Sequence, residues 1–69
     1  MDMAAELRGR MASQQVTVAA VAEMVGRTPI QVSRYRTGNT TIPLDVAQAL
    51  YRNDLLPREA LLGPETDAA

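Results

Sequence analysis

The stretch Thr17–Gly38 has the sequence TVAAVAEMVGRTPIQVSRYRTG and predicts two short helices separated by a tight turn. In its first half, valine and alanine recur at helical spacing over 18–25, and three valines share one face with Ala22. Thr17 is a favourable N-terminal cap for that helix, and Gly26 tolerates the left-handed conformation that commonly ends one. We therefore expect a helix over 18–25 that closes at Gly26.

A second helix is expected directly after the turn, over 29–37. Thr28 suits its cap, and Pro29 suits its first position, where a missing N–H group costs nothing. Gly38 is placed to end it. Two short helices joined by a glycine turn are typical of a helix-turn-helix.

The packing of these two helices follows from the sizes of their residues. They cross steeply, so the side chain at the crossing must be small, and Ala22 meets that need. In the second helix Val32 and Tyr35 are expected to point inward, with Tyr35 serving the core more than any ligand. The same phasing leaves Ile30 exposed, on a face that could enter the major groove of DNA, which is about 12 Å wide.

The flanking sequence predicts further helices on both sides. Asp2 can cap the first of them, and prolines precede or begin the others. The expected ranges are 3–13, 44–52 and 57–62. The fold class is therefore all-α, a compact four- to five-helix domain over 1–63. A disordered acidic tail is expected over 64–69.

Composition excludes several classes of function. The 69 residues include no cysteine and no histidine, which removes disulfides, the usual zinc ligands and the usual nucleophile–base pairs of enzymes. We therefore expect no enzymatic activity, no cofactor, no metal and no small-molecule ligand. No apolar run approaches the about 18 residues of a membrane span, and the N-terminus lacks a secretion signal. No membrane role and a cytoplasmic location are expected.

The net charge of −1 is distributed unevenly along the chain. Residues 24–44 carry three arginines and no acid, whereas residues 45–69 carry five acids and two arginines. The middle segment could therefore meet phosphate while the C-terminal part repels it. The alternative is that these charges form an ordinary solvated surface.

The segment 17–38 resembles the Cro/repressor helix-turn-helix family, also called XRE-type or lambda-repressor-like. The run VSRY at 32–35, followed by Gly38, carries most of the resemblance, and 43–50 and 55–63 are similar to the family's next helices. The resemblance implies a lambda-repressor-like fold. It also implies a sequence-specific transcriptional regulator, such as a Cro-like phage or bacterial repressor, that binds a palindromic operator in double-stranded DNA as a homodimer.

The resemblance further implies which side chains meet DNA. One set is expected at base edges in the major groove and another at the phosphates. The base-contacting set is Thr28, Pro29, Ile30, Gln31, Ser33 and Arg34. The phosphate-contacting set is Thr17, Val18, Arg27, Arg36, Asn39, Thr40 and Thr41. Direct readout of bases is expected to fall on Ile30, Ser33 and Arg34, with Gln31 and Thr28 as helpers. Arg34 could grip guanine O6 and N7 through two hydrogen bonds.

Three positions depart from the family pattern. Val18 stands where a glutamine usually contacts phosphate, so only its backbone N–H group can supply that contact. Arg27 replaces an apolar residue and could reach the DNA backbone. Pro29 stands where a side chain often contacts bases, and it cannot donate a hydrogen bond.

Simpler alternatives exist for most of these assignments. Thr17 and Thr28 could serve only as helix caps, and Arg34 and Arg36 could be surface charges. The polar residues over 39–41 could be ordinary loop residues.

The dimer surface is expected near the C-terminal end, among four leucines of which some must instead cover the core: Leu55, Leu56, Leu61 and Leu62. A competing interpretation keeps the same fold but makes the chain an antitoxin or a protein-interaction adaptor with little affinity for DNA. The acidic isoelectric point favours that alternative.

Overall fold

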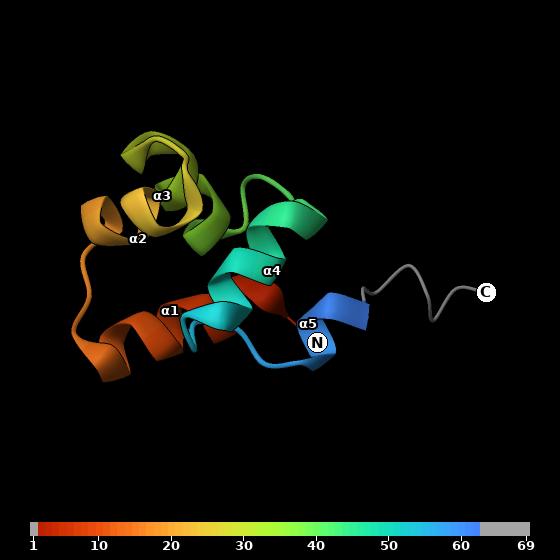
Figure 1. The fold of residues 1–69 in the computed structure, drawn as a ribbon. Helices are drawn as coiled ribbons and strands as arrows, with labels where there is room; N and C mark the ends of the chain where they lie inside the picture. Colours follow the sequence, from red (N-terminus) through yellow and green to blue (C-terminus); the bar gives the residue numbers. More distant parts are fainter. Residues whose placement is uncertain (1, 63–69) are drawn as a thin grey trace.

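The computed structural model describes residues 2–62 of the chain, and for Leu62 only the backbone. Every regular element within this range is a helix, and the order along the chain is α1 (Met3–Gln14), α2 (Val18–Val25), α3 (Pro29–Thr37), α4 (Leu44–Arg52) and α5 (Glu59–Leu62) (Figure 1). The all-helical class expected from the sequence is confirmed. The tail expected over 64–69 lies outside the described residues.

The helix boundaries agree with the sequence-based ranges to within two residues. α1 ends one residue later than expected, and α5 begins at Glu59 rather than at Pro57. Before α5, the carbonyl oxygens of Pro57 and Arg58 accept hydrogen bonds from the N–H groups of Ala60 and Leu61, both at 3.0 Å. Pro57 therefore begins a turn that leads into the helix.

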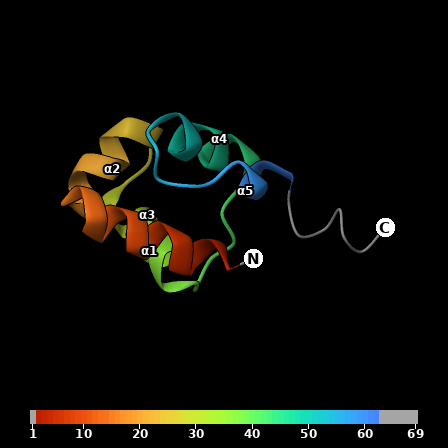
Figure 2. The same ribbon diagram turned by 90° about the horizontal axis from the view of Figure 1, so that it is seen from below.

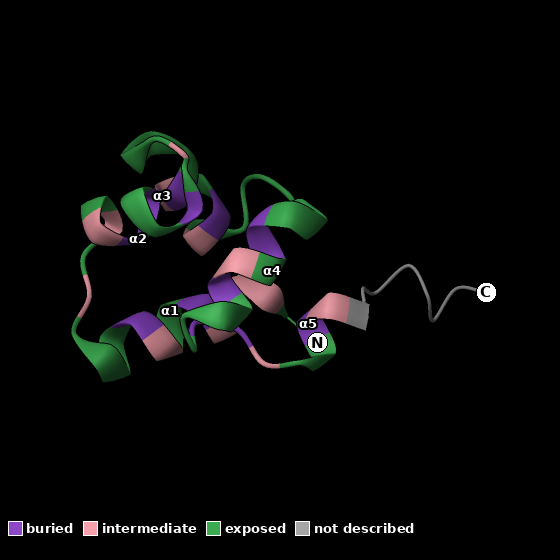
Figure 3. Ribbon diagram, viewed as in Figure 1, coloured by how far each residue is buried: buried purple, intermediate pink, exposed green. Residues whose placement is uncertain are grey.

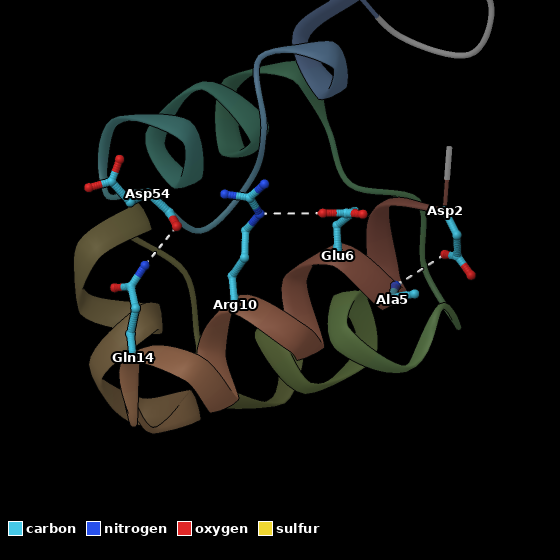
Figure 4. Close-up of polar contacts among 6 residues, drawn as sticks. All are labelled: Asp2, Ala5, Glu6, Arg10, Gln14 and Asp54. Carbon is cyan, nitrogen blue, oxygen red and sulfur yellow. Dashed lines mark hydrogen bonds and ion pairs between the residues drawn. The ribbon is translucent and has the colours of Figure 1, made fainter.

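α1 is fixed at both ends by polar side chains (Figure 4). At its start, the Asp2 carboxylate accepts a hydrogen bond from the N–H group of Ala5 at 3.2 Å, as expected of a cap. Its end is closed by Gln15, which adopts the left-handed conformation with φ 57°. The side-chain amide of Gln14 donates to the carbonyl oxygen of Asp54 at 2.7 Å, which ties α1 to the segment after α4.

The connection between α2 and α3 is as tight as the sequence predicts. The Thr17 hydroxyl accepts a hydrogen bond from the N–H group of Ala20 at 3.1 Å and so caps α2. Gly26 ends the helix in the left-handed conformation, with φ 69° and ψ 35°. The N–H groups of Gly26 and Arg27 both donate to the carbonyl oxygen of Ala22. Two residues then separate this turn from the first residue of α3.

Replacing Gly26 by alanine is expected to lower the free energy of unfolding by about 1 kcal/mol, because a Cβ atom is disfavoured at positive φ. A Cβ at this position would meet no atom within 4 Å, so the cost is conformational rather than steric. Gly26→Asn should cost less, since asparagine tolerates this conformation. Gly9→Ala, inside α1, should instead stabilise by about 0.5–1 kcal/mol. Thermal unfolding followed by circular dichroism measures all three, and equal losses for alanine and asparagine at Gly26 would contradict the argument.

One hydrophobic cluster joins residues from all five helices (Figure 3). The inner faces of the helices are buried and their outer faces are exposed, as the helical spacing of the apolar residues requires. The largest fully buried side chains are Leu7, Val21, Val32, Val46, Leu50, Leu55 and Leu56. This single core holds together segments that are distant in the sequence.

The sequence-based dimer surface needs a correction at Leu55 and Leu56. Both side chains are buried in the core of a single chain, with 0% and 1% of their surface exposed, so neither is available to a second copy. Leu61 is half-buried against the same core, and the side chain of Leu62 lies outside the described residues. The core needs Leu55 and Leu56 because they are among its largest fully buried side chains.

The helix packing leaves one side of α3 uncovered. α3 packs on α1 and α2, while α4 packs on α2 and α5. In Figure 1, α2 and α3 lie at one end of the molecule and α5 lies at the other. The view from below shows α1 along the front, with α4 on the opposite side (Figure 2). α3 therefore presents its remaining side to the outside of the molecule.

Candidate functional site

α3 divides sharply into a buried face and an exposed face. Val32 and Tyr35 are buried in the core, as the sequence predicts. Ile30 keeps 66% of its surface exposed, Arg34 is exposed and Ser33 is half-buried. At about 100° per residue, the last three fall on one outward face of the helix. The structure thus brings together the three residues expected to contact bases most directly.

The N-terminal end of α3 is held in place by a capping box. The Thr28 hydroxyl accepts a hydrogen bond from the N–H group of Gln31 at 3.2 Å, and the Gln31 side-chain oxygen accepts one from the N–H group of Thr28 at 3.0 Å. Pro29 occupies the first helical position and is exposed. Thr28 and Gln31 therefore act on each other here, which matches the alternative that they shape the helix end.

Arg27 does not project freely from the turn. Its guanidinium group donates to the Asp45 carboxylate of α4 at 2.7 Å, and a second bond of 3.4 Å reaches the carbonyl oxygen of Gly26. The hydrogen bond from Arg27 to Asp45, and secondarily a contact with Tyr35, raises the pKa of Arg27 above its usual value. This expected phosphate contact is therefore largely neutralised by a carboxylate that lies eighteen positions away in the sequence.

Arg8 is a cation that sequence reasoning did not assign to the site. Its guanidinium group donates to the backbone carbonyl oxygen of Arg36 at 2.7 Å, so α1 places a positive charge beside the C-terminal end of α3. The Nε atom of Arg36 is buried and has no hydrogen-bond partner among the described residues. No signal in the sequence indicates this neighbourhood, since it depends on how α1 packs against α3.

The other expected phosphate contacts lie at two separate places. Thr17 is exposed at the start of α2, whereas the Val18 side chain is half-buried against the core, so only its backbone can face a ligand. Asn39, Thr40 and Thr41 are exposed in the segment after α3. The N–H groups of Asn39 and Thr40 donate to the carbonyl oxygen of Arg34 at 3.0 and 3.4 Å, which fixes the start of this segment.

The charges around α3 favour an anionic ligand. Within residues 2–62 two ion pairs are present, Arg10 with Glu6 in α1 (Figure 4) and Arg27 with Asp45. In that range no carboxylate pairs with Arg8, Arg34 or Arg36. The N-terminal ends of α2 and α3 add the partial positive charge of their first N–H groups. The surface around α3 thus combines these three arginines with exposed side chains that carry hydrogen-bonding and apolar atoms, and Asp2 lines the same hollow as Thr40 and Thr41.

Two kinds of feature are not found in the described part of the chain. Over residues 2–62 no group of three acidic, histidine or cysteine side chains is placed to hold a metal ion. In the same range no helix is long and apolar enough to cross a membrane.

Comparisons of the chain with models of protein families, with curated proteins and with solved structures gave no match.

Proposed function

We propose that the chain is a helix-turn-helix domain of the lambda-repressor-like type that binds double-stranded DNA in a sequence-specific manner and regulates transcription. α2 and α3 are the two helices of the motif, and α3 is the recognition helix that enters the major groove. One observation carries the proposal: Ile30, Ser33 and Arg34 share the outward face of a helix whose opposite face is locked in the core.

Each residue on this face has a chemical role that suits a base edge. Arg34 donates two hydrogen bonds to the O6 and N7 atoms of a guanine. Ile30 packs against the methyl group of a thymine, and its exposure of 66% in the free protein makes that burial favourable. Ser33 can donate to or accept from a neighbouring base.

The phosphates on either side of the groove are held by groups around the recognition helix. The first N–H groups of α2, apart from the one that donates to the Thr17 hydroxyl, bind an anion as helix N-termini commonly do. Arg36 and the segment over 39–41 lie at the other end of α3 and supply the second set of contacts. Arg27 contributes less than the resemblance implies, because Asp45 already accepts its hydrogen bond.

A palindromic operator bound by two copies of the chain completes this proposal. In such a complex the two recognition helices lie about 34 Å apart, one helical turn of DNA. A regulator of this kind works where the DNA is, in the cytoplasm of a bacterial or phage-infected cell. Selection of bound sites from random duplexes tests the proposal, and a site with two-fold symmetry is the expected result.

The salt dependence of binding to the selected site is a sharper test. With Arg36 in each of two copies contacting phosphate, affinity should fall at least about tenfold between roughly 50 and 200 mM salt, and about a hundredfold if Arg27 of each copy also contacts phosphate. Arg58→Gln changes an exposed charge outside the surface around α3 and should leave that slope unaltered. A response to salt that is flat, or a failure to bind any duplex at low salt, contradicts DNA binding.

A protein-interaction adaptor is the second candidate function. The observation that favours it is the Arg27–Asp45 ion pair, which removes one of three arginines from the acid-free segment, together with the net charge of −1. In this case the exposed face of α3 would bind a protein partner and discrimination among duplexes would be absent. The selection experiment separates the two candidates, since an adaptor enriches no common site.

A further inference from the structure

α4 carries a second exposed face that the proposed DNA contacts do not use. Its inner side, formed by Val46, Ala47 and Leu50, is buried in the core. On the outer side, Leu44 and Tyr51 keep 59% and 40% of their surface exposed. Two exposed apolar side chains do not by themselves mark a docking surface, so the case for one depends on how they are arranged with the charges beside them.

The outer face of α4 has two chemically different edges. At about 100° per residue, Leu44 and Tyr51 lie along one edge, Asp45 and Arg52 lie along the other, and Gln48 lies between them. The Asp45 side chain keeps 67% of its surface exposed, and no ion pair within residues 2–62 involves Arg52. The apolar edge thus has Leu44 in the first turn and Tyr51 in the last turn. The charged edge has an acid, Asp45, in the first turn and a base, Arg52, in the last turn.

This pattern is complementary to itself when reversed. Consider a two-fold axis that runs beside Gln48, perpendicular to α4, so that two α4 helices meet antiparallel. The apolar edges then face each other, with Leu44 against Tyr51 of the second copy. The charged edges also face each other, with Asp45 beside Arg52 of the second copy, and the two Gln48 amides meet at the axis. A two-fold interface requires this kind of self-complementarity.

We propose that a second copy of this chain docks antiparallel on the outer face of α4. The proposal identifies the interface of the operator-binding dimer and, to that extent, rests on the proposed function. It replaces the C-terminal leucines, two of which the core occupies. Asp45 can accept from Arg27 of its own chain and from Arg52 of the other, because a carboxylate offers about four acceptor sites.

The residues beyond Leu62 are a poor alternative occupant of this face. Their sequence, GPETDAA, contains no large apolar side chain to cover Leu44 and Tyr51. Its two acids lie close together, whereas the charges on α4 have opposite signs at opposite ends. The arrangement on α4 matches another α4 better than it matches this segment.

The dimer is expected to be weak in the absence of DNA. The nine residues of α4 span about 13 Å, and a contact of that length buries less than the about 1,200 Å² that is typical of stable interfaces. Self-association should therefore appear only at high protein concentration, and a palindromic site should strengthen it by holding two copies side by side.

Sedimentation velocity of the full chain over a range of concentrations tests the proposal without DNA. Leu44→Gln should weaken self-association about tenfold, because it removes apolar burial from both copies. Arg52→Glu should weaken it to a similar extent by placing like charges opposite each other. Glu23→Lys and Arg58→Glu change exposed charges outside α4 and should leave association unchanged.

A mixing experiment provides the decisive result. Asp45→Lys and Arg52→Glu chains each meet like charges when they pair with themselves, but a mixed pair restores two opposite-charge contacts. The mixture should therefore associate at least about tenfold more tightly than either variant alone. Equal association in the mixture, or a wild-type chain that stays monomeric at every concentration, overturns the proposal. Circular dichroism of each variant shows whether it is folded. Because Asp45→Lys also removes the ion pair between Arg27 and Asp45, Leu44→Gln provides a second test of self-association that leaves this ion pair intact.

The self-association measured in these experiments does not depend on whether the chain binds DNA. If the α4 contact is wrong and the proposed function is right, a single half-site still binds the protein with an affinity that falls as salt rises, at about half the slope of the full site. If the proposed function is wrong and the contact is right, self-association and its rescue by mixing persist with no preferred duplex.

Discussion

Leu55→Ala is expected to lower the free energy of unfolding by about 2–5 kcal/mol and to leave much of the chain unfolded at room temperature. Leu55 is fully buried, so its truncation removes apolar contacts and leaves a cavity in the core. A domain of this length buries only about 60% of its unfolded surface and has little stability to lose. Urea titration followed by circular dichroism measures the change.

The titration also separates a core role from a dimer role. The loss should be the same at two protein concentrations that differ tenfold, because the cavity forms within a single chain. Leu55→Met, which nearly conserves volume, should cost less than about 1.5 kcal/mol. Ile30→Ala, at an exposed position, should change stability by no more than about 0.5 kcal/mol. A Leu55→Ala chain that is as stable as wild type, yet fails to self-associate, would return this residue to the interface.

Arg34→Ala is expected to relax the preference for one base pair in the selected operator, with a loss of about 1–3 kcal/mol in discrimination. The exposed side chain of Arg34 contacts no carboxylate within residues 2–62, so its five donors remain available to a guanine. Binding to the selected site should weaken about ten- to a hundredfold. Binding to a duplex with that base pair changed should weaken far less. Competition between the two duplexes measures the difference.

Arg36→Gln provides the matched comparison, since it removes a charge from the same helix without removing a base contact. It should weaken binding to both duplexes alike and reduce the salt slope by about one for each copy. Because the Arg36 Nε atom is buried, the stability of this variant must be measured alongside its affinity. Equal weakening of both duplexes by Arg34→Ala would show that Arg34 contacts only the backbone.

Local signals explain why the helix boundaries could be predicted from the sequence. Thr17, Gly26, Thr28 and Gly38 act on groups within a few positions of themselves, and the structure shows each cap or left-handed turn where it was expected. Gln15 and Asp54 were exceptions, with φ 57° and 62°, because positive φ is uncommon for residues other than glycine and the sequence did not predict it at either position.

The interactions that the sequence could not predict all join distant segments. The Arg8–Arg36 contact spans twenty-eight positions and the Arg27–Asp45 contact spans eighteen. Both depend on how helices pack, and nothing in the local pattern selects one arginine for a carboxylate and another for a carbonyl. Likewise, two adjacent leucines at 55–56 look the same in the sequence whether they are buried in the core of their own chain or contact a second copy.

The outward face of α3 could be predicted from the sequence because the pattern of apolar residues within this one helix determines it. Val32 and Tyr35 are the only large apolar residues at helical spacing on the inner side of that helix, and their burial fixes the direction of Ile30 and Arg34. The periodicity of one helix therefore sufficed to identify its outward face.

The single core has a consequence for how this fold is lost. Leu7 of α1 and Ala60 of α5 belong to one cluster, so displacing either helix opens the apolar interior that the other helices share. Residues 2–62 should therefore melt in one cooperative transition, with no folded fragment left behind.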